Sequence, residues 1–304
     1  MQQRPPEPSS PSVLRARDEM EAWTYKKLMD ADAVYVAGGT LLRTQWESGE
    51  TSIPRHLIDV SSIPGLTGIE KLESGLVVGA ATTLGRCRRD PRIARYFPAL
   101  AEALRAIASP SVRNLATLGG NIVSRVGDSL PALMVYRAEL EWNTGFSPMI
   151  EEATEWAERL QDQMPKASHL LVRVHLPIAM PSEAVPRRIE SYRKVGRREA
   201  FVPSLVTVAL SAGARADGRI ADIAIAAGGG RTIPHRLRAA ERLLKGQRVG
   251  GELLREVHQA AMKGYKPAPD PFATEAYRKQ TAANLIVAEL WERLGAGGRE
   301  GEEE

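Results

Sequence analysis

Two pairs of adjacent glycines are the residues whose type and spacing could bind a ligand through the backbone. Residues 38–39 follow an apolar run and precede a helix-forming stretch, and residues 119–120 lie in a second, mostly apolar passage. Glycine permits positive φ, and because it lacks a Cβ a ligand can approach its backbone closely. Successive N–H groups at such a turn, together with a helix N-terminus, suit phosphate oxygens. Hydroxyl and amide side chains accompany both turns: Thr40, Thr117, Asn121 and Ser124.

The alternative interpretation is that each glycine pair forms an ordinary turn between a strand and a helix. For one isolated pair this is the commoner explanation, but two pairs in one region, each followed by small polar residues, weaken it. Neither passage matches the dinucleotide fingerprint G-x-G-x-x-G or the P-loop pattern G-x-x-x-x-G-K-[ST]. A Rossmann or P-loop site is therefore not supported. The two remaining interpretations are a phosphate site of another kind and a pair of ordinary turns.

Other residues capable of chemistry form no recognisable catalytic set. The histidines lack HExxH or any other metal-ligand spacing, so no metal site is predicted. Cys87 lies among arginines that could lower the pKa of its thiol, although a single thiol in a helical turn is more often incidental. No G-x-S-x-G nucleophile elbow is present. The histidines are His56, His169, His175, His235 and His258.

Basic residues gather in two clusters. A solvated face or ion pairs between subunits is the commoner explanation for such clusters, and an anion site is the alternative. The first cluster holds Arg86, Arg88, Arg89, Arg92 and Arg95, and the second holds Arg193, Lys194, Arg197 and Arg198.

Length and composition limit the possible classes of protein. The 304 residues correspond to about two domains, and 43% apolar residues are enough for a buried core. A net charge of +4 and 5% aromatic residues do not favour a nucleic-acid-binding protein. The single cysteine excludes a disulfide framework and any thiolate-held zinc or iron–sulfur cluster within this chain. The lack of a bilayer-length apolar run and of a signal-peptide core predicts a soluble, cytoplasmic protein.

Hydrophobic patterns predict that strands alternate with helices in the first part of the chain. In the second part they predict strands followed by helices. The predicted strands cover about 33–37, 56–60, 75–80, 169–176, 204–212 and 220–227. The predicted helices cover about 16–29, 41–48, 97–108, 235–245, 251–263 and 274–293. The proline-rich stretch 177–186 is the candidate domain boundary, and 1–12 and 296–304 are predicted to be disordered tails.

An ordered set of motifs runs along the chain: YVAGGTLL, VVGAATTLG, ASPSVRNLATLGGNI, YRKVGRREAFVPSLVTVAL, AAGGGRTIPHRLRAAERLLKG and DPFATEAYRKQTAANLI. Together they resemble the flavin-binding subunits of the molybdenum hydroxylases, which include those of xanthine dehydrogenase and aerobic carbon monoxide dehydrogenase. The resemblance implies an α+β fold. A two-part FAD-binding domain of mixed α/β units, similar to that of vanillyl-alcohol oxidase, would occupy 13–180, with subdomains at about 13–85 and 86–180. A smaller α+β C-terminal flavoprotein domain with a sheet and helices would occupy 187–295.

The resemblance also implies where FAD binds. The two glycine turns would hold its diphosphate from opposite sides, Ser124 and Asp128 would reach sugar or ribityl hydroxyls, and Leu170 and Leu171 would lie near the flavin ring. Lys194 would lie at the polar edge of the flavin, where its charge would favour the reduced form. The implied cofactor-binding residues are Val36, Ala37, Gly38, Gly39, Thr40, Leu41, Thr117, Gly119, Gly120, Asn121, Ser124, Asp128, Leu171 and Lys194.

Two departures from the family pattern limit this transfer. The spacing from Asn121 to Asp128 is shorter than is usual in the family and contains no proline, and region 143–166 matches poorly, so no role is transferred there. For the glycines, we expect Gly38→Val or Gly119→Val to abolish flavin retention with limited loss of fold, because a Cβ would block the diphosphate.

By the same resemblance the chain is an electron-transfer subunit that is not active alone on the organic substrate. Molybdopterin and [2Fe–2S] clusters would belong to a large and a small partner subunit, and electrons would pass through FAD to NAD or another acceptor. A xanthine dehydrogenase is the favoured complex. The alternatives are a carbon monoxide or aldehyde dehydrogenase flavin subunit, a flavoenzyme that works alone, and a non-redox module that binds nucleic acid or another anion through its arginines.

Overall fold

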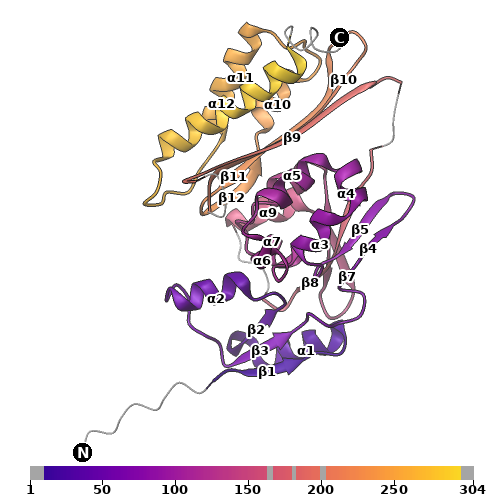
Figure 1. Cartoon of the computed structure of the whole chain (residues 1–304), viewed down its shortest axis with the longest axis vertical. Helices are drawn as coiled ribbons and strands as arrows, with labels where there is room; N and C mark the ends of the chain where they lie inside the picture. Colours follow the sequence, from indigo (N-terminus) through magenta and orange to yellow (C-terminus); the bar gives the residue numbers. More distant parts are fainter. Residues whose placement is uncertain (1–9, 163–166, 180–182, 199–202, 296–304) are drawn as a thin grey trace, which may run out of the picture.

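The computed structural model describes residues 10–162, 167–179, 183–198 and 203–295. Three layers follow one another along its longest axis (Figure 1). A small sheet with two helices lies at the N-terminal end, a helix-rich body lies in the middle, and the last sheet, covered by three helices, lies at the other end. No helix in the described ranges is long and apolar enough to cross a membrane.

The small sheet is parallel and has the strand order β1-β3-β2. Asp18 caps helix α1 by accepting from the Glu21 amide, and a short 3₁₀ turn at Asp30–Asp32 leads into β2. Helix α2 follows β2 through the first glycine turn. The elements are β1 (Ser12–Arg15), α1 (Glu19–Met29), β2 (Ala33–Val36), α2 (Thr40–Glu47) and β3 (His56–Asp59).

The middle body is built on an antiparallel sheet of order β4-β5-β8-β6-β7. Its helices are short, and several begin with proline, which fits the first helical position because no amide is needed there. The strands are β4 (Ile69–Lys71), β5 (Gly75–Gly79), β6 (Glu139–Asn143), β7 (Pro148–Glu152) and β8 (Leu170–Pro177). The helices are α3 (Leu84–Arg89), α4 (Pro91–Tyr96), α5 (Pro98–Ala106), α6 (Pro110–Arg113), α7 (Leu118–Val123), α8 (Leu130–Val135) and α9 (Ala153–Asp162).

The C-terminal part pairs an antiparallel sheet of order β12-β11-β10-β9 with three helices on its outer face (Figure 1). Both faces of this sheet are buried, as the side chains of β10 show. Val208 and Leu210 belong to the core shared with the helices, whereas Ala209 belongs to the core of the middle body. The elements are β9 (Arg187–Gly196), β10 (Ser204–Ala214), β11 (Ile220–Gly229), β12 (Thr232–Arg236), α10 (Arg238–Leu244), α11 (Gly251–Gly264) and α12 (Glu275–Leu294).

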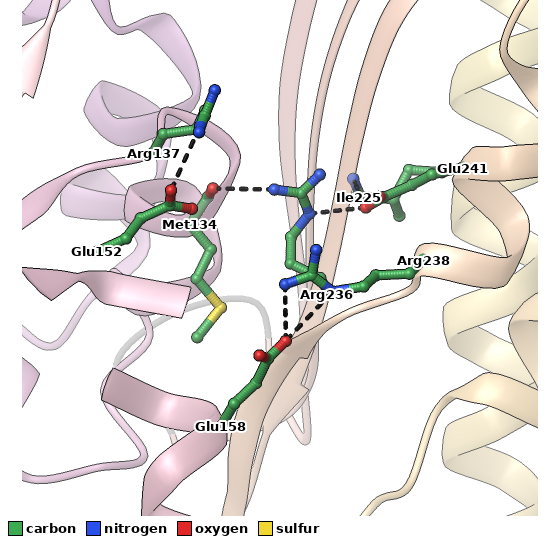
Figure 2. Close-up of polar contacts among 8 residues, drawn as sticks. All are labelled: Met134, Arg137, Glu152, Glu158, Ile225, Arg236, Arg238 and Glu241. Carbon is green, nitrogen blue, oxygen red and sulfur yellow. Dashed lines mark hydrogen bonds and ion pairs between the residues drawn. The ribbon is translucent and has the colours of Figure 1, made fainter. Parts of the chain in front are cut away.

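Polar contacts fasten this sheet to the middle body (Figure 2). Arg236 is mostly buried, pairs with Glu241 at 2.7 Å and also donates to the Met134 carbonyl of α8. Nearby, Arg238 pairs with Glu158 of α9 at 2.9 Å. The two parts are therefore held together by the Arg238–Glu158 ion pair and the hydrogen bond from Arg236, as well as by the contact of α8 and α5 with the sheet.

The predicted α+β fold class is confirmed, and the predicted helices at 251–263 and 274–293 correspond to α11 and α12. Sequence patterns did not predict the ten-residue strand β9, nor β6, β7 and α9. The suggested division near residue 85 also differs from the structure, because β5 pairs with β8 and thus belongs to the middle sheet. Of the predicted tails, residues 1–9 and 296–304 lie outside the described residues, while Ser12 begins β1.

Candidate cofactor site

The first glycine turn joins β2 to α2 and leaves an open helix N-terminus. Gly39 is the N-cap residue with φ of +64°, and no side chain of the described chain caps this end. The first N–H groups of a helix have no partner inside the helix. The amides of Thr40 and Leu41 are therefore available to an anion, and the helix dipole favours negative charge at this position.

The second glycine turn, at the start of α7, uses its amides differently. The Leu118 amide donates to the Thr82 carbonyl at 2.9 Å, and the Gly119 amide donates to the Ala80 carbonyl at 2.8 Å. The Gly120 amide is capped by the Thr117 hydroxyl. The expectation that successive amides of both turns are open to phosphate is thus wrong for the second turn. Its amides hold α7 against the end of β5.

The two turns lie side by side, and glycine makes this packing possible. A Cβ on Gly38 would lie 2.0 Å from the Leu115 carbonyl oxygen, just before the second turn. A Cβ on Gly119 would lie 2.7 Å from the Ala80 carbonyl oxygen. A side chain at either position would collide with the protein's own backbone. The expected limited loss of fold on substitution of these glycines is therefore corrected: both residues are needed for packing.

A cavity of about 310 Å³ opens beside the turns. Five of the residues implied by the sequence line it: Ala37, Thr117, Gly119, Gly120 and Leu171. The others are not among its lining residues: Val36, Gly38, Gly39, Thr40, Leu41, Asn121, Ser124, Asp128 and Lys194. The Ser124 hydroxyl donates to the Asn121 carbonyl at 2.6 Å, and the Asn121 side chain accepts from Ser129. Asn121 and Ser124 therefore organise the loop that follows α7.

Asp128 and Lys194 form a mostly buried ion pair of 2.8 Å between the middle body and β9. The Lys194 ammonium also donates to the Ala106 carbonyl at the end of α5, and Asp128 accepts from the Ser204 hydroxyl. Burial raises the pKa of the neighbouring Tyr192 hydroxyl, and the Asp128 charge adds to that effect. The structure thus brings two implied site residues together, although each is already paired within the chain.

The far wall of the cavity comes from residues to which the sequence assigned no role. Trp142 of β6, Met149 and Glu151 of β7, and Trp156 and Arg159 of α9 line it. Trp142 and Met149 are cross-strand partners, and Glu151 lies two residues further along the same face. The alternation in ELEWN and PMIEE was the available signal, but these strands are only five residues long.

The near wall belongs to the small sheet. Tyr35 of β2 donates its hydroxyl hydrogen to the Ser168 carbonyl at 3.0 Å, and burial raises the pKa of that hydroxyl. Lys26 of α1 donates to the Ala33 carbonyl at 2.6 Å, and burial lowers the pKa of its ammonium. The Lys26 bond holds α1 on β2, and the Tyr35 bond joins the small sheet to the segment before β8, so the cavity lies between two layers of the fold.

Residues considered for other chemistry have structural roles. Burial raises the pKa of the Cys87 thiol to about 12, which makes it a poor nucleophile. Arg92 pairs with Asp90, and Arg193 pairs with Glu289, so both arginine clusters contribute intramolecular ion pairs. Within the described ranges no group of three or more His, Cys, Asp or Glu side chains could hold a metal ion.

The chemistry of the site fits a large phosphate-containing cofactor. An open helix N-terminus lies next to a cavity whose lining is largely apolar, and such a combination suits a ligand with an anionic centre and an aromatic end. The close approach of the two turns, which only glycine permits at Gly38, keeps these features together.

Two sequence families match the chain, one over its N-terminal part and the other over its C-terminal part. The family described as "FAD binding domain in molybdopterin dehydrogenase" matches residues 9–179, and the family described as "CO dehydrogenase flavoprotein C-terminal domain" matches residues 190–292. The chain therefore belongs to the FAD-binding subunits of the molybdenum hydroxylases. FAD is accordingly the cofactor of this chain.

Individual relatives agree with this assignment. The xanthine dehydrogenase FAD-binding subunit of Escherichia coli O157:H7 is 26% identical over 270 residues, covering 88% of this chain and 90% of the relative. The nicotine 6-hydroxylase medium subunit of Paenarthrobacter nicotinovorans is 28% identical over 269 residues, covering 84% and 88%. The carbon monoxide dehydrogenase structure from Hydrogenophaga pseudoflava has a similar fold, with a TM-score of 0.84, 24% identity and coverage of 93% and 98%.

Proposed function

We propose that this chain is the electron outlet of a xanthine dehydrogenase-like complex. A small partner subunit with [2Fe–2S] centres would deliver electrons to FAD, and a large partner subunit with molybdopterin would oxidise the purine. When bound, FAD would accept these electrons and pass them to NAD or another acceptor. The similarity to a xanthine dehydrogenase FAD-binding subunit, at 26% identity over 88% of this chain and 90% of the relative, supports this choice of complex.

The observation that carries the proposal is the open N-terminus of α2 beside the cavity. The first turn, from Val36 to Leu41, would hold the diphosphate through its amides and the Thr40 hydroxyl. Thr117 to Asn121 would close the other side. Ser124, Asp128 and Lys194 would approach the sugar or flavin end, and Leu171 would contact a ring of the cofactor. No side chain of this chain needs to act as acid or base, since the reaction at FAD here is electron transfer.

Co-purification from the source cell tests the proposal. We expect the chain to copurify with two further subunits, and the complex to contain FAD, iron and molybdenum and to reduce NAD⁺ when xanthine is added. A yellow complex that does not oxidise xanthine but oxidises carbon monoxide or an aldehyde would instead indicate a carbon monoxide or aldehyde dehydrogenase. Colourless protein with strongly salt-dependent affinity for DNA or RNA would favour the anion-binding alternative.

A further inference from the structure

A fully buried arginine of α12 holds the first residues of β10. The Arg278 side chain has no exposed surface, pairs with Asp270 and donates to the Leu205 carbonyl. Asp270 is itself held just before α12, because it accepts from the backbone amides of Phe272 and Ala273. A planar guanidinium can make these bonds at the same time. Arg278 therefore fixes the start of β10 against α12.

The start of β10 also carries a serine that touches the middle body. Ser204 is buried, and its hydroxyl donates to Asp128 at 2.6 Å. The Gly230 amide, just after β11, donates to the Ser204 carbonyl at 2.8 Å, next to the Leu205 carbonyl that Arg278 holds. Because two successive carbonyls are bound, the position of the Ser204 hydroxyl is set from the α12 side of the sheet.

Ser204 and Lys194 share one carboxylate. Asp128 pairs with the Lys194 ammonium through its Oδ2 oxygen at 2.8 Å and accepts from Ser204 through its Oδ1 oxygen. A hydrogen bond to an ionised group is stronger than one between neutral groups. The hydroxyl therefore satisfies part of the Asp128 charge, while the ammonium also donates to the Ala106 carbonyl at 2.9 Å.

We propose that Arg278 and Ser204 are positioning residues for the flavin of FAD. Together they set the charge that the Asp128–Lys194 pair presents to it. This inference rests on the proposed function, in which that pair approaches the flavin end of FAD. A carboxylate that loses a donor presents more negative charge to its surroundings, and negative charge disfavours the electron-rich reduced flavin. The helix α12, on the outer face of the C-terminal sheet (Figure 1), would thereby adjust the reduction potential without contacting the cavity.

The midpoint potential of FAD bound to the full chain, measured by reductive titration with a reference dye, tests the proposal. Ser204→Ala should lower the ratio of reduced to oxidised flavin at a fixed ambient potential by about threefold, which is roughly 15 mV for a two-electron couple. Ser211→Ala is the matched control and should keep the wild-type potential. Ser211 is a buried serine of the same strand, and its hydroxyl accepts from Arg188 instead of donating to Asp128.

Arg278→Lys tests the other end of the link. Lysine keeps the charge but lacks the planar group that holds Asp270 and the Leu205 carbonyl together. We expect the potential to fall, as in Ser204→Ala. The double variant should fall no further than the larger single effect, because both changes act through one hydroxyl. Arg236→Lys, which alters another mostly buried arginine of the C-terminal part, should leave the potential unchanged.

A wild-type potential in Ser204→Ala would overturn the proposal, whether or not the Arg278 variant folds. A wild-type potential in Arg278→Lys, additive shifts in the double variant, or an equal shift in Ser211→Ala or Arg236→Lys would also overturn it.

The premise has its own test, because Lys194→Met should lower the potential by more than Ser204→Ala does. A wild-type potential in Lys194→Met would refute the proposed approach of Lys194 to the flavin, and the inference with it. A lowered potential in Lys194→Met without any shift in Ser204→Ala would refute the inference alone. The measurement needs neither substrate nor partner subunits, so a complex that fails to oxidise xanthine leaves its result unchanged.

Discussion

At the scale of single residues, the space around Gly38 distinguishes it from a surface glycine. A Cβ on Gly38 would lie 2.0 Å from the Leu115 carbonyl oxygen, whereas a Cβ on Gly49, which has φ of +70°, would meet nothing within 4 Å. We expect Gly38→Ala to lower the free energy of unfolding by about 1–3 kcal/mol through overpacking, with loss of FAD. Gly49→Ala should cost about 1 kcal/mol through backbone strain alone and leave the FAD content unchanged.

Urea unfolding and the FAD released on denaturation measure both effects. Wild-type stability together with full FAD content in Gly38→Ala would show that the two turns do not pack as described.

A second prediction at this scale concerns Lys194, which neutralises the Asp128 carboxylate where the middle body meets the C-terminal part. Asp128 and Lys194 are both mostly buried and lie 2.8 Å apart. Lys194→Met should lower the free energy of unfolding by about 3 kcal/mol, since it leaves Asp128 without its counter-charge. In an Asp128→Asn background the same change should cost much less. Equal costs in both backgrounds, measured by urea unfolding, would show that the pair is not coupled.

The sequence pointed to these site residues but not to their contacts. The glycine turns could be found because two glycine pairs near small polar residues are visible in the sequence itself. The partners of the Leu118 and Gly119 amides could not be found, because they lie in the segment around Ala80 and Thr82, far away in the chain. The Asp128–Lys194 pair forms only when β9 docks on the middle body.

At the scale of elements, the contact of β12 and α10 with the middle body allows a paired comparison of two arginines (Figure 2). The side chain of Arg236 is 11% exposed and that of its partner Glu241 is 12% exposed, whereas those of Arg238 and Glu158 are 54% and 45% exposed. Arg236→Met should therefore lower the free energy of unfolding by about 3 kcal/mol. Arg238→Met should cost about 1 kcal/mol or less, because water screens an exposed pair. Similar costs for both variants in urea unfolding would contradict the described interface.

Elements with a clear apolar period were predictable, and those with mixed exposure were not. Strand β8 alternates and α12 is long, so both could be predicted. Strand β9 carries arginine, lysine and glutamate because it is an edge strand, whose Tyr192 amide donates to Glu102 of α5 instead of to another strand. Charges at a sheet edge are common, but a sequence does not reveal which helix covers the edge.

At the scale of the whole molecule, carboxylates paired with arginine or lysine make the free energy of unfolding depend on pH in the acid range. Hydrogen bonds from Arg17 lower the pKa of Glu21 from 4.5 to about 2, and hydrogen bonding from Lys279 lowers the pKa of Glu275. A carboxyl whose pKa is lower in the folded state stabilises the fold above its ordinary pKa, and this contribution is lost as the pH falls through the folded value. Burial raises the pKa of Glu190, so its protonation at acid pH acts in the opposite direction.

We therefore expect the free energy of unfolding to fall between about pH 5 and about pH 2, with the lowered carboxylates outweighing Glu190. Urea unfolding across this range measures the change. Stability that stays level or rises toward pH 2 would contradict the ion pairs described.

The whole molecule places an open helix N-terminus beside a largely apolar cavity, and the central claim is that one FAD molecule binds to both. A crystal structure of the chain with FAD tests this most directly. The account predicts diphosphate oxygens within hydrogen-bonding distance of the Thr40 and Leu41 amides, and a ring of the cofactor in contact with Leu171. A diphosphate bound away from the N-terminus of α2, or an FAD molecule that leaves the cavity empty, would contradict it.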